Sequence, residues 1–103
     1  MSYSAVDPII EAWTKAHSLT LFTSVAGQER RFCYTSSAKG ECFQVSIEQP
    51  RNAEVIVHAW SIETIDDVEM HEEWISTVAN LRPALDAALA KIREWMTRAR
   101  PPT

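Results

Sequence analysis

The stretch ECFQVSIE, residues 41–48, alternates polar and apolar side chains without a break. Three apolar residues share one side of an extended chain: Phe43, Val45 and Ile47. The other side carries Cys42, Gln44, Ser46 and Glu48. A period of two residues is typical of a β-strand with one buried face. The stretch therefore predicts a strand whose apolar face belongs to the core.

Similar segments flank this strand and are separated from it by short turns. The segments predicted to be strands are 19–25, 30–36 and 54–63, with Gly27 and Gly40 in two of the turns. In 30–36 we expect Phe32 and Tyr34 to face the core and Cys33 to lie on the less apolar face, near Cys42. Short connections between successive strands predict an antiparallel meander.

Helices are predicted at both ends of the meander. Asp7-Pro8 is typical of a helix start, so residues 8–17 are predicted to be helical, with Asp7 as the cap. The last helix is predicted to begin near Asn80, because Pro83 fits only the first turn of a helix. Residues 69–78 then become a fifth strand. The alternative is a longer helix from about Asp67 that is kinked at Pro83.

These elements predict an α+β two-layer sandwich, with a meander of four or five strands and both helices on one sheet face. The 103 residues suffice for a single domain, for which we expect short disordered tails at 1–5 and 100–103. The chain has 46% hydrophobic residues and a net charge of −4. The acidic balance argues against a nucleic-acid binder. The absence of a basic start or a long apolar run predicts a cytoplasmic protein that does not bind membranes and has reduced cysteines.

No motif identifies an enzyme or a cofactor. The sequence has no G-x-S-x-G elbow and none of the closely spaced His/Cys/Glu sets of zinc sites. Cys33 or Cys42 beside His58 is the one conceivable nucleophilic pair, and nothing in the sequence indicates that either thiol is activated. His58 and His71 could approach across a hairpin, but ordinary structural histidines explain them as well. We therefore predict no catalytic residue, no metal and no cofactor, and enzymatic activity stays undecided, with the balance against it.

An acidic run follows the fourth strand. Six carboxylates lie within eleven residues that contain no Lys or Arg: Glu63, Asp66, Asp67, Glu69, Glu72 and Glu73. The spacing lacks the glycine and the alternation of a calcium loop. Three interpretations stay open: a solvated hairpin whose charge protects a sheet edge, a surface for a basic partner protein, and a metal site with His71 as an extra ligand.

The length of the turn after Glu48 decides which face of 54–63 is buried, because a slip of one residue reverses every side chain. A five-residue loop pairs Ile47 with Val55 and buries Val55, Val57 and Ala59. With a hairpin loop at 66–68, Trp60 lies opposite Trp74. The face predicted to stay open then carries Phe22, Ile56, His58, Trp60, Ile62 and Trp74.

Two functions follow from this arrangement. The first is a small acidic, non-enzymatic protein-binding module that uses the open face and the acidic hairpin (Asp66, Asp67, Glu69, Glu72 and Glu73), most simply as a homodimer. An immunity- or chaperone-type protein is one such case, by size and charge alone. The second is a small enzyme or ligand-binding domain with a pocket between helix and sheet.

Overall fold

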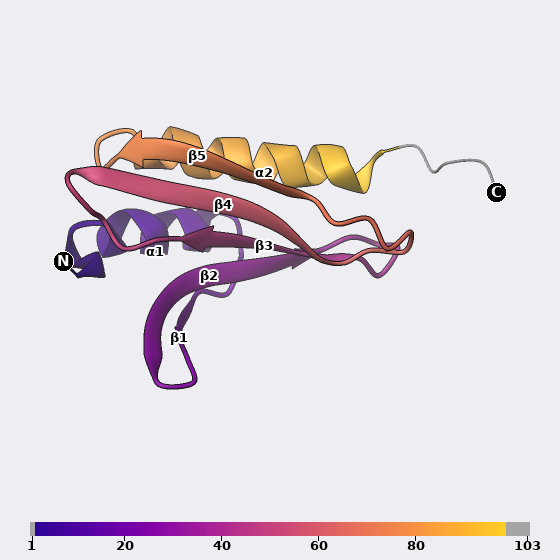
Figure 1. The fold of residues 1–103 in the computed structure, drawn as a ribbon, viewed down its shortest axis with the longest axis horizontal. Coiled ribbons are helices and arrows are strands. Elements are labelled where there is room, and N and C mark those ends of the chain that lie inside the picture. The colour runs from indigo at the N-terminus through magenta and orange to yellow at the C-terminus, as the bar shows by residue number, and fades with distance from the viewer. Residues whose placement is uncertain (1, 99–103) are drawn as a thin grey trace.

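A computed structural model describes residues 2–98, and its elements follow the predicted order. Their bounds are η1 Tyr3–Ala5, α1 Asp7–Ala16, β1 Phe22–Val25, β2 Gln28–Ser36, β3 Cys42–Ile47, β4 Glu54–Glu63, β5 His71–Thr77 and α2 Leu81–Met96. The strands form one antiparallel sheet in the order β1-β2-β3-β4-β5, and both helices lie on one face of it (Figure 1). The predicted α+β meander is confirmed, including β5 and a last helix that begins after Asn80.

The core lies between the sheet and the helices. From the sheet it takes Phe43, Val45 and Ile47 of β3 and Val55, Val57 and Ala59 of β4, all 3% exposed or less. From the helices it takes Ile10, Trp13, Leu81, Leu85, Ala88, Leu89 and Ile92. The Trp13 Nε1–H donates to Asp86 Oδ1 at 2.9 Å and so ties α1 to α2. In the part of the chain that the structure describes, no helix is both long and apolar enough to cross a membrane.

The buried face of β4 is the predicted one, although the residue pairing between β3 and β4 differs from the prediction. Ile47 lies opposite Val57 instead of Val55, and Val45 lies opposite Ala59. The register is shifted by two residues from the prediction. An even shift leaves each side chain on its face, which is why the prediction of the face held.

The prediction for Trp74 is wrong. Trp60 lies opposite His71, and Trp74 lies opposite Val57, on the face that the helices cover. Residues 61 and 63 near the end of β4 pair with β3, and the last pair between β4 and β5 is Trp60–His71, so the connection is not symmetric about the predicted loop at 66–68. It shifts the register by three residues, and an odd shift turns Trp74 toward the core, where it is partly buried.

The prediction for β2 is also wrong. Cys33 pairs with Val45 and is 1% exposed in the core, whereas Phe32 pairs with Ser46 and Tyr34 with Gln44 on the open face. Cys33 and Cys42 thus lie on opposite faces and are not neighbours. Both are free thiols.

Two smaller expectations fail at the N-terminus. Val6, not Asp7, is the cap residue of α1, because the Asp7 carboxylate accepts from Arg31 Nε at 2.6 Å. Tyr3 does not lie in a disordered tail: it is 3% exposed, and its hydroxyl donates to the Ile47 carbonyl at 2.9 Å. The predicted tail at 100–103 lies outside the described residues.

Candidate functional site

The face of the sheet opposite the helices is the candidate site. Its apolar residues are Phe22, Phe32, Tyr34, Ile56, Trp60, Ile62 and Ile75. Four of these are strongly exposed: Ile75 at 65%, Ile62 at 53%, Phe22 at 41% and Tyr34 at 40%. Phe32, Tyr34 and Ile75 were missed by the sequence analysis, because their positions depend on strand register.

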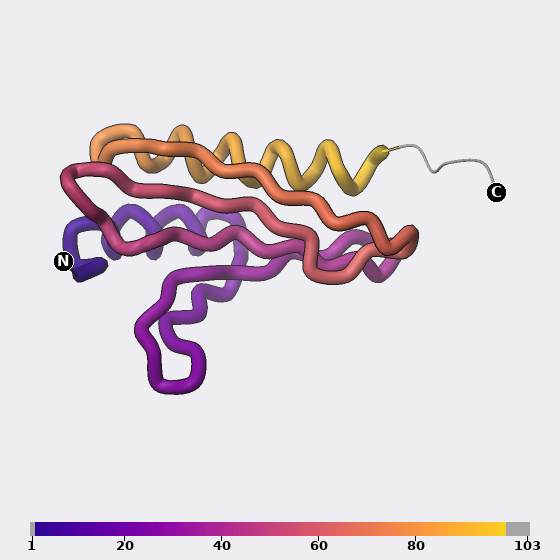
Figure 2. Tube along the Cα trace, viewed as in Figure 1, coloured from indigo at the N-terminus to yellow at the C-terminus, as the bar shows by residue number. Residues whose placement is uncertain are grey.

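Three aromatic side chains of the β1–β2 hairpin pack on one another at one side of this face. The Phe22 and Phe32 rings stack at 5.2 Å, and Tyr34 meets both edge-on, at 5.7 and 5.5 Å between ring centroids. This contact buries Phe32 without any help from the helices. A register shift between Phe22 and Ser24 marks an irregularity of β1, and β2 bends so strongly that the hairpin leaves the plane of the sheet (Figure 2).

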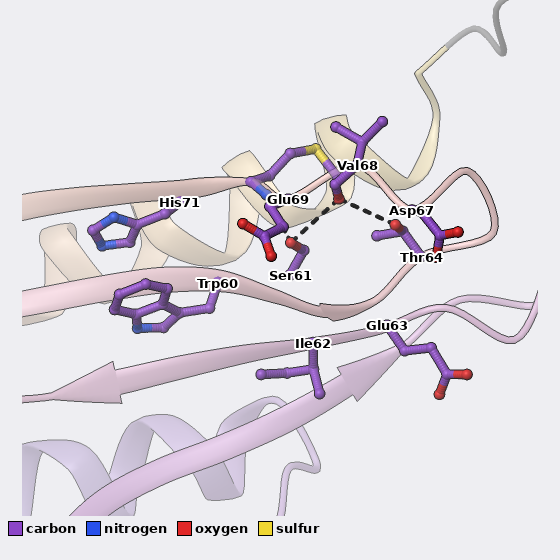
Figure 3. A pocket seen from close by; sticks show the side chains of 10 residues that line it. Trp60, Ser61, Ile62, Glu63, Thr64, Asp67, Val68, Glu69 and His71 are labelled. Carbon is purple, nitrogen blue, oxygen red and sulfur yellow. Dashed lines mark hydrogen bonds between the residues drawn. The ribbon is translucent and has the colours of Figure 1, made fainter.

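The bent hairpin and the rest of the open face enclose a groove of about 520 Å³. Aromatic and charged side chains line it, among them Arg30, Phe32, Tyr34, His58 and Trp60. A second cavity, of about 580 Å³, lies where β4 and β5 diverge toward their connecting loop (Figure 3). There the Ser61 and Thr64 hydroxyls donate to the Val68 carbonyl, at 3.5 and 3.1 Å. Neither of these two cavities lies between the helices and the sheet, where the ligand-binding alternative expected one, but two more open hollows of about 450 and 300 Å³ lie between β5 and α2.

Two histidines and a tryptophan meet at the centre of the open face. His71 lies flat on Trp60, with ring centroids 3.7 Å apart and planes inclined by 11° (Figure 3). His58 Nδ1 is 2.9 Å from His71 Nε2. Two carboxylates face His58: Glu48 Oε2 is 2.5 Å from Nε2, and Glu73 Oε2 is 3.6 Å from Nδ1. β4, β5 and Glu48, the residue that follows β3, thus each bring a polar group to one point.

The acidic run does not act as one surface. The Asp66 carboxylate accepts from Arg98 at 2.6 Å, and Glu72, on the helix face, lies 3.6 Å from Lys91 Nζ. Glu73 lies on the open face beside His58. Asp67 has a positive φ of 55° in the turn, and Glu69 is exposed and lines the second cavity.

A buried carboxylate that the sequence analysis missed lies at the same end of the sheet. Glu41 is 1% exposed; it accepts from Arg98 Nη2 at 2.8 Å and from the Ile65 backbone N–H at 3.2 Å. The hydrogen bonds from Arg98 lower the pKa of both Glu41 and Asp66, and those carboxylates raise the pKa of Arg98. The three side chains join the β2–β3 turn, the β4–β5 loop and the end of α2. Their role is to hold these segments together.

The thiols are not placed for nucleophilic catalysis. Burial raises the pKa of Cys33 to about 11, and Cys33 faces the helices whereas His58 faces the open side. Cys42 lies on the open face, but four residues along β3 from Ser46, the partner of His58. That spacing is about 13 Å along a strand, too far for a Cys–His dyad.

Comparison of the chain with protein-family models, with curated proteins and with solved structures finds no match. The open face is therefore the feature from which a function can be inferred.

Proposed function

We propose that this chain is a non-enzymatic protein-binding module whose docking surface is the open sheet face, and that its first partner is a second copy of itself. The observation that supports this proposal is the exposure of Ile75, Ile62, Phe22 and Tyr34 on one uncovered face. Several large apolar side chains exposed on one uncovered sheet face are a feature of interaction surfaces. Trp60 and Tyr34 also belong to the residue types that dominate binding energy at interfaces.

The size of the face approaches that of such an interface. Ten residues of β4 extend for about 33 Å, and four spacings between five strands give about 19 Å. The product, roughly 600 Å², is an upper limit for a flat sheet, because the other strands are shorter than β4 and the β1–β2 hairpin leaves the plane (Figure 2). A stable interface takes about 800 Å² from each partner, so a dimer on this face would also use the sides of the exposed side chains and of the bent hairpin. Two open faces related by a two-fold axis would each supply the same surface.

The charges on the face are mixed, and this favours a self-complementary partner over a strongly basic one. Arg30 lines the groove together with Glu48, and Asp66 and Glu72 of the acidic run are already paired within the chain.

Cys33 and Cys42 are unpaired, which supports a reducing compartment such as the cytoplasm.

Sedimentation of Ile75→Lys tests the proposal. Ile75 is 65% exposed, so a lysine there leaves the monomer fold intact and puts a charge into the interface. We expect wild type to sediment as a dimer, in the presence of a chelator, and Ile75→Lys as a monomer. Ile65→Lys is the matched control, because Ile65 is 42% exposed in the β4–β5 loop, off this face. A monomeric wild type at high concentration would refute the homodimer.

A further inference from the structure

The cluster at the centre of the open face has the make-up of a metal site. His58, His71 and Glu73 each offer a nitrogen or carboxylate oxygen, and these three atoms lie within 4.8 Å of one another. They come from two neighbouring strands: His58 lies directly opposite Glu73, and His71 lies opposite Trp60. Their convergence therefore follows from the sheet pairing and does not depend on a loop.

The Glu48 carboxylate orients the His58 imidazole, and this is a second, independent feature of a metal site. The carboxylate accepts hydrogen bonds and donates none, so the His58 Nε2 atom, 2.5 Å away, carries the proton. The lone pair of neutral His58 is then on Nδ1, the atom that faces His71 and Glu73. A carboxylate that orients a histidine through its far nitrogen is the usual outer partner of a metal-binding imidazole.

The surroundings hold the His58 ring more firmly than the His71 ring. The His58 side chain is 12% exposed, while Glu48 and Glu73 are about half exposed, so the imidazole is held and the carboxylates reach solvent. The indole of Trp60 lies against His71 at 3.7 Å and also stacks on His58 at 5.3 Å. His71 is exposed on the edge strand β5, which gives its ring freedom to turn toward an ion.

The separations suit a tetrahedral ion. Zinc–nitrogen and zinc–oxygen bonds of about 2.0–2.1 Å require donor atoms about 3.3 Å apart. The distances from His58 Nδ1 are 2.9 Å to His71 Nε2 and 3.6 Å to Glu73 Oε2, on either side of that value. A small turn of the His71 ring, with its proton moving from Nε2 to Nδ1, therefore replaces the His–His hydrogen bond with two metal bonds.

We propose that His58, His71 and Glu73 bind a divalent first-row transition metal, with Zn²⁺ as the physiological ion and Glu48 as the residue that orients His58. Two imidazoles and one carboxylate suit zinc, whereas Ca²⁺ and Mg²⁺ require six or more oxygen ligands. Three protein ligands leave the fourth position to water or to a ligand atom from a bound partner. This site lies within the proposed docking surface, and the zinc titration and the sedimentation in chelator test the two proposals separately.

The test is calorimetric titration of untagged, chelator-treated protein with ZnCl₂, together with the visible absorption of CoCl₂ added to the same protein. We expect one Zn²⁺ per chain, a tetrahedral Co²⁺ spectrum, and no heat with MgCl₂. His71→Asn and Glu73→Gln remove a ligand and should abolish binding or weaken it by more than about 100-fold. Glu48→Gln should weaken it by about 10- to 100-fold, the usual effect of losing an outer partner.

Two controls separate this site from adventitious binding. Glu72→Gln changes the neighbouring carboxylate, which lies on the other sheet face near Lys91, and His17→Gln removes the histidine at the end of α1. Both should bind Zn²⁺ as wild type does. If wild type binds no Zn²⁺, or if His71→Asn and Glu73→Gln bind it as tightly as these controls do, the proposal is overturned. Exposed His71 and Glu73 tolerate substitution, and a thermal midpoint in chelator verifies that each variant is folded.

Discussion

Ile56 and Val57 are neighbours in β4 that face opposite sides of the sheet. Alanine substitutions at the two positions should therefore have different effects on stability and on dimerisation. Val57 is fully buried between sheet and helices, whereas Ile56 is half-buried on the open face opposite Ile75. Val57→Ala removes two methyl groups, worth about 0.8 kcal/mol each. A residual cavity of about 50 Å³ adds about 1.2 kcal/mol at 24 cal/mol per Å³. The expected loss in the free energy of unfolding is therefore about 2–3 kcal/mol.

The same free energy predicts a shift in melting temperature. An unfolding entropy of about 2.1 cal/mol/K per residue gives about 0.22 kcal/mol/K for 103 residues, so 2.5 kcal/mol corresponds to about 12 °C. Ile56→Ala loses only cross-strand contact with Ile75 in the monomer, about 0.2–1 kcal/mol. Its larger effect should be on dimerisation.

Urea unfolding at low protein concentration measures the first effect, and sedimentation at high concentration measures the second. We expect Val57→Ala to lower the urea midpoint with an unchanged slope and to keep its dimer while folded. Ile56→Ala should change the urea midpoint little and should weaken the dimer. If Ile56→Ala is destabilised as much as Val57→Ala and still dimerises like wild type, the assignment of the two faces of β4 is refuted.

Two further predictions concern groups away from the open face. With a thiol reagent at pH 8, we expect Cys42 to react in the native protein and Cys33 only upon unfolding, because Cys33 is 1% exposed and its pKa is raised to about 11 by burial; equal native rates would contradict its position in the core. Hydrogen bonds from Arg98 lower the pKa of Glu41 below its ordinary value of 4.5. The resulting stability is therefore present above pH 4.5 and is lost as the pH falls through the lowered pKa. Denaturation experiments from pH 7 to pH 3 should show that Glu41→Gln has a lower free energy of unfolding than wild type at pH 7. The difference between the two proteins should become smaller as the pH falls. A difference that stays constant over this range would exclude the linkage between the Glu41 pKa and stability.

The fold was predictable where the alternation of side chains was complete. In residues 41–48 and 54–63 the burial pattern follows the period of two, and the predicted core face of both segments is correct. The pairing between them was wrong by two residues, since the turn after Glu48 contains an Arg51–Glu54 bridge that the sequence did not reveal. The predicted buried residues were still correct, because a shift by an even number of residues leaves every side chain on the same face.

Hydrophobicity alone misplaced the side chains of β2. Phe32 and Tyr34 are more apolar than their neighbours Arg31 and Cys33, and this pattern favoured a buried position for the aromatic pair. The structure buries Cys33 and also Arg31, which is 9% exposed because Asp7 and Glu29 accept its hydrogen bonds. An ion pair formed by residues 24 positions apart in the sequence leaves no local pattern.

The register between β4 and β5 determines both the largest error and the candidate site. With Trp60 opposite Trp74, as the sequence analysis predicted, His71 would lie opposite Glu63 and five residues away from His58. The shift of three residues that turns Trp74 into the core also places His71 beside Trp60 and Glu73 opposite His58. The sequence shows two histidines that a hairpin could bring together, but only the register between β4 and β5 decides whether they share a face. The buried Trp74 and the His58–His71–Glu73 cluster are thus two consequences of one pairing, and evidence that Trp74 is on the open face would exclude the metal site as well.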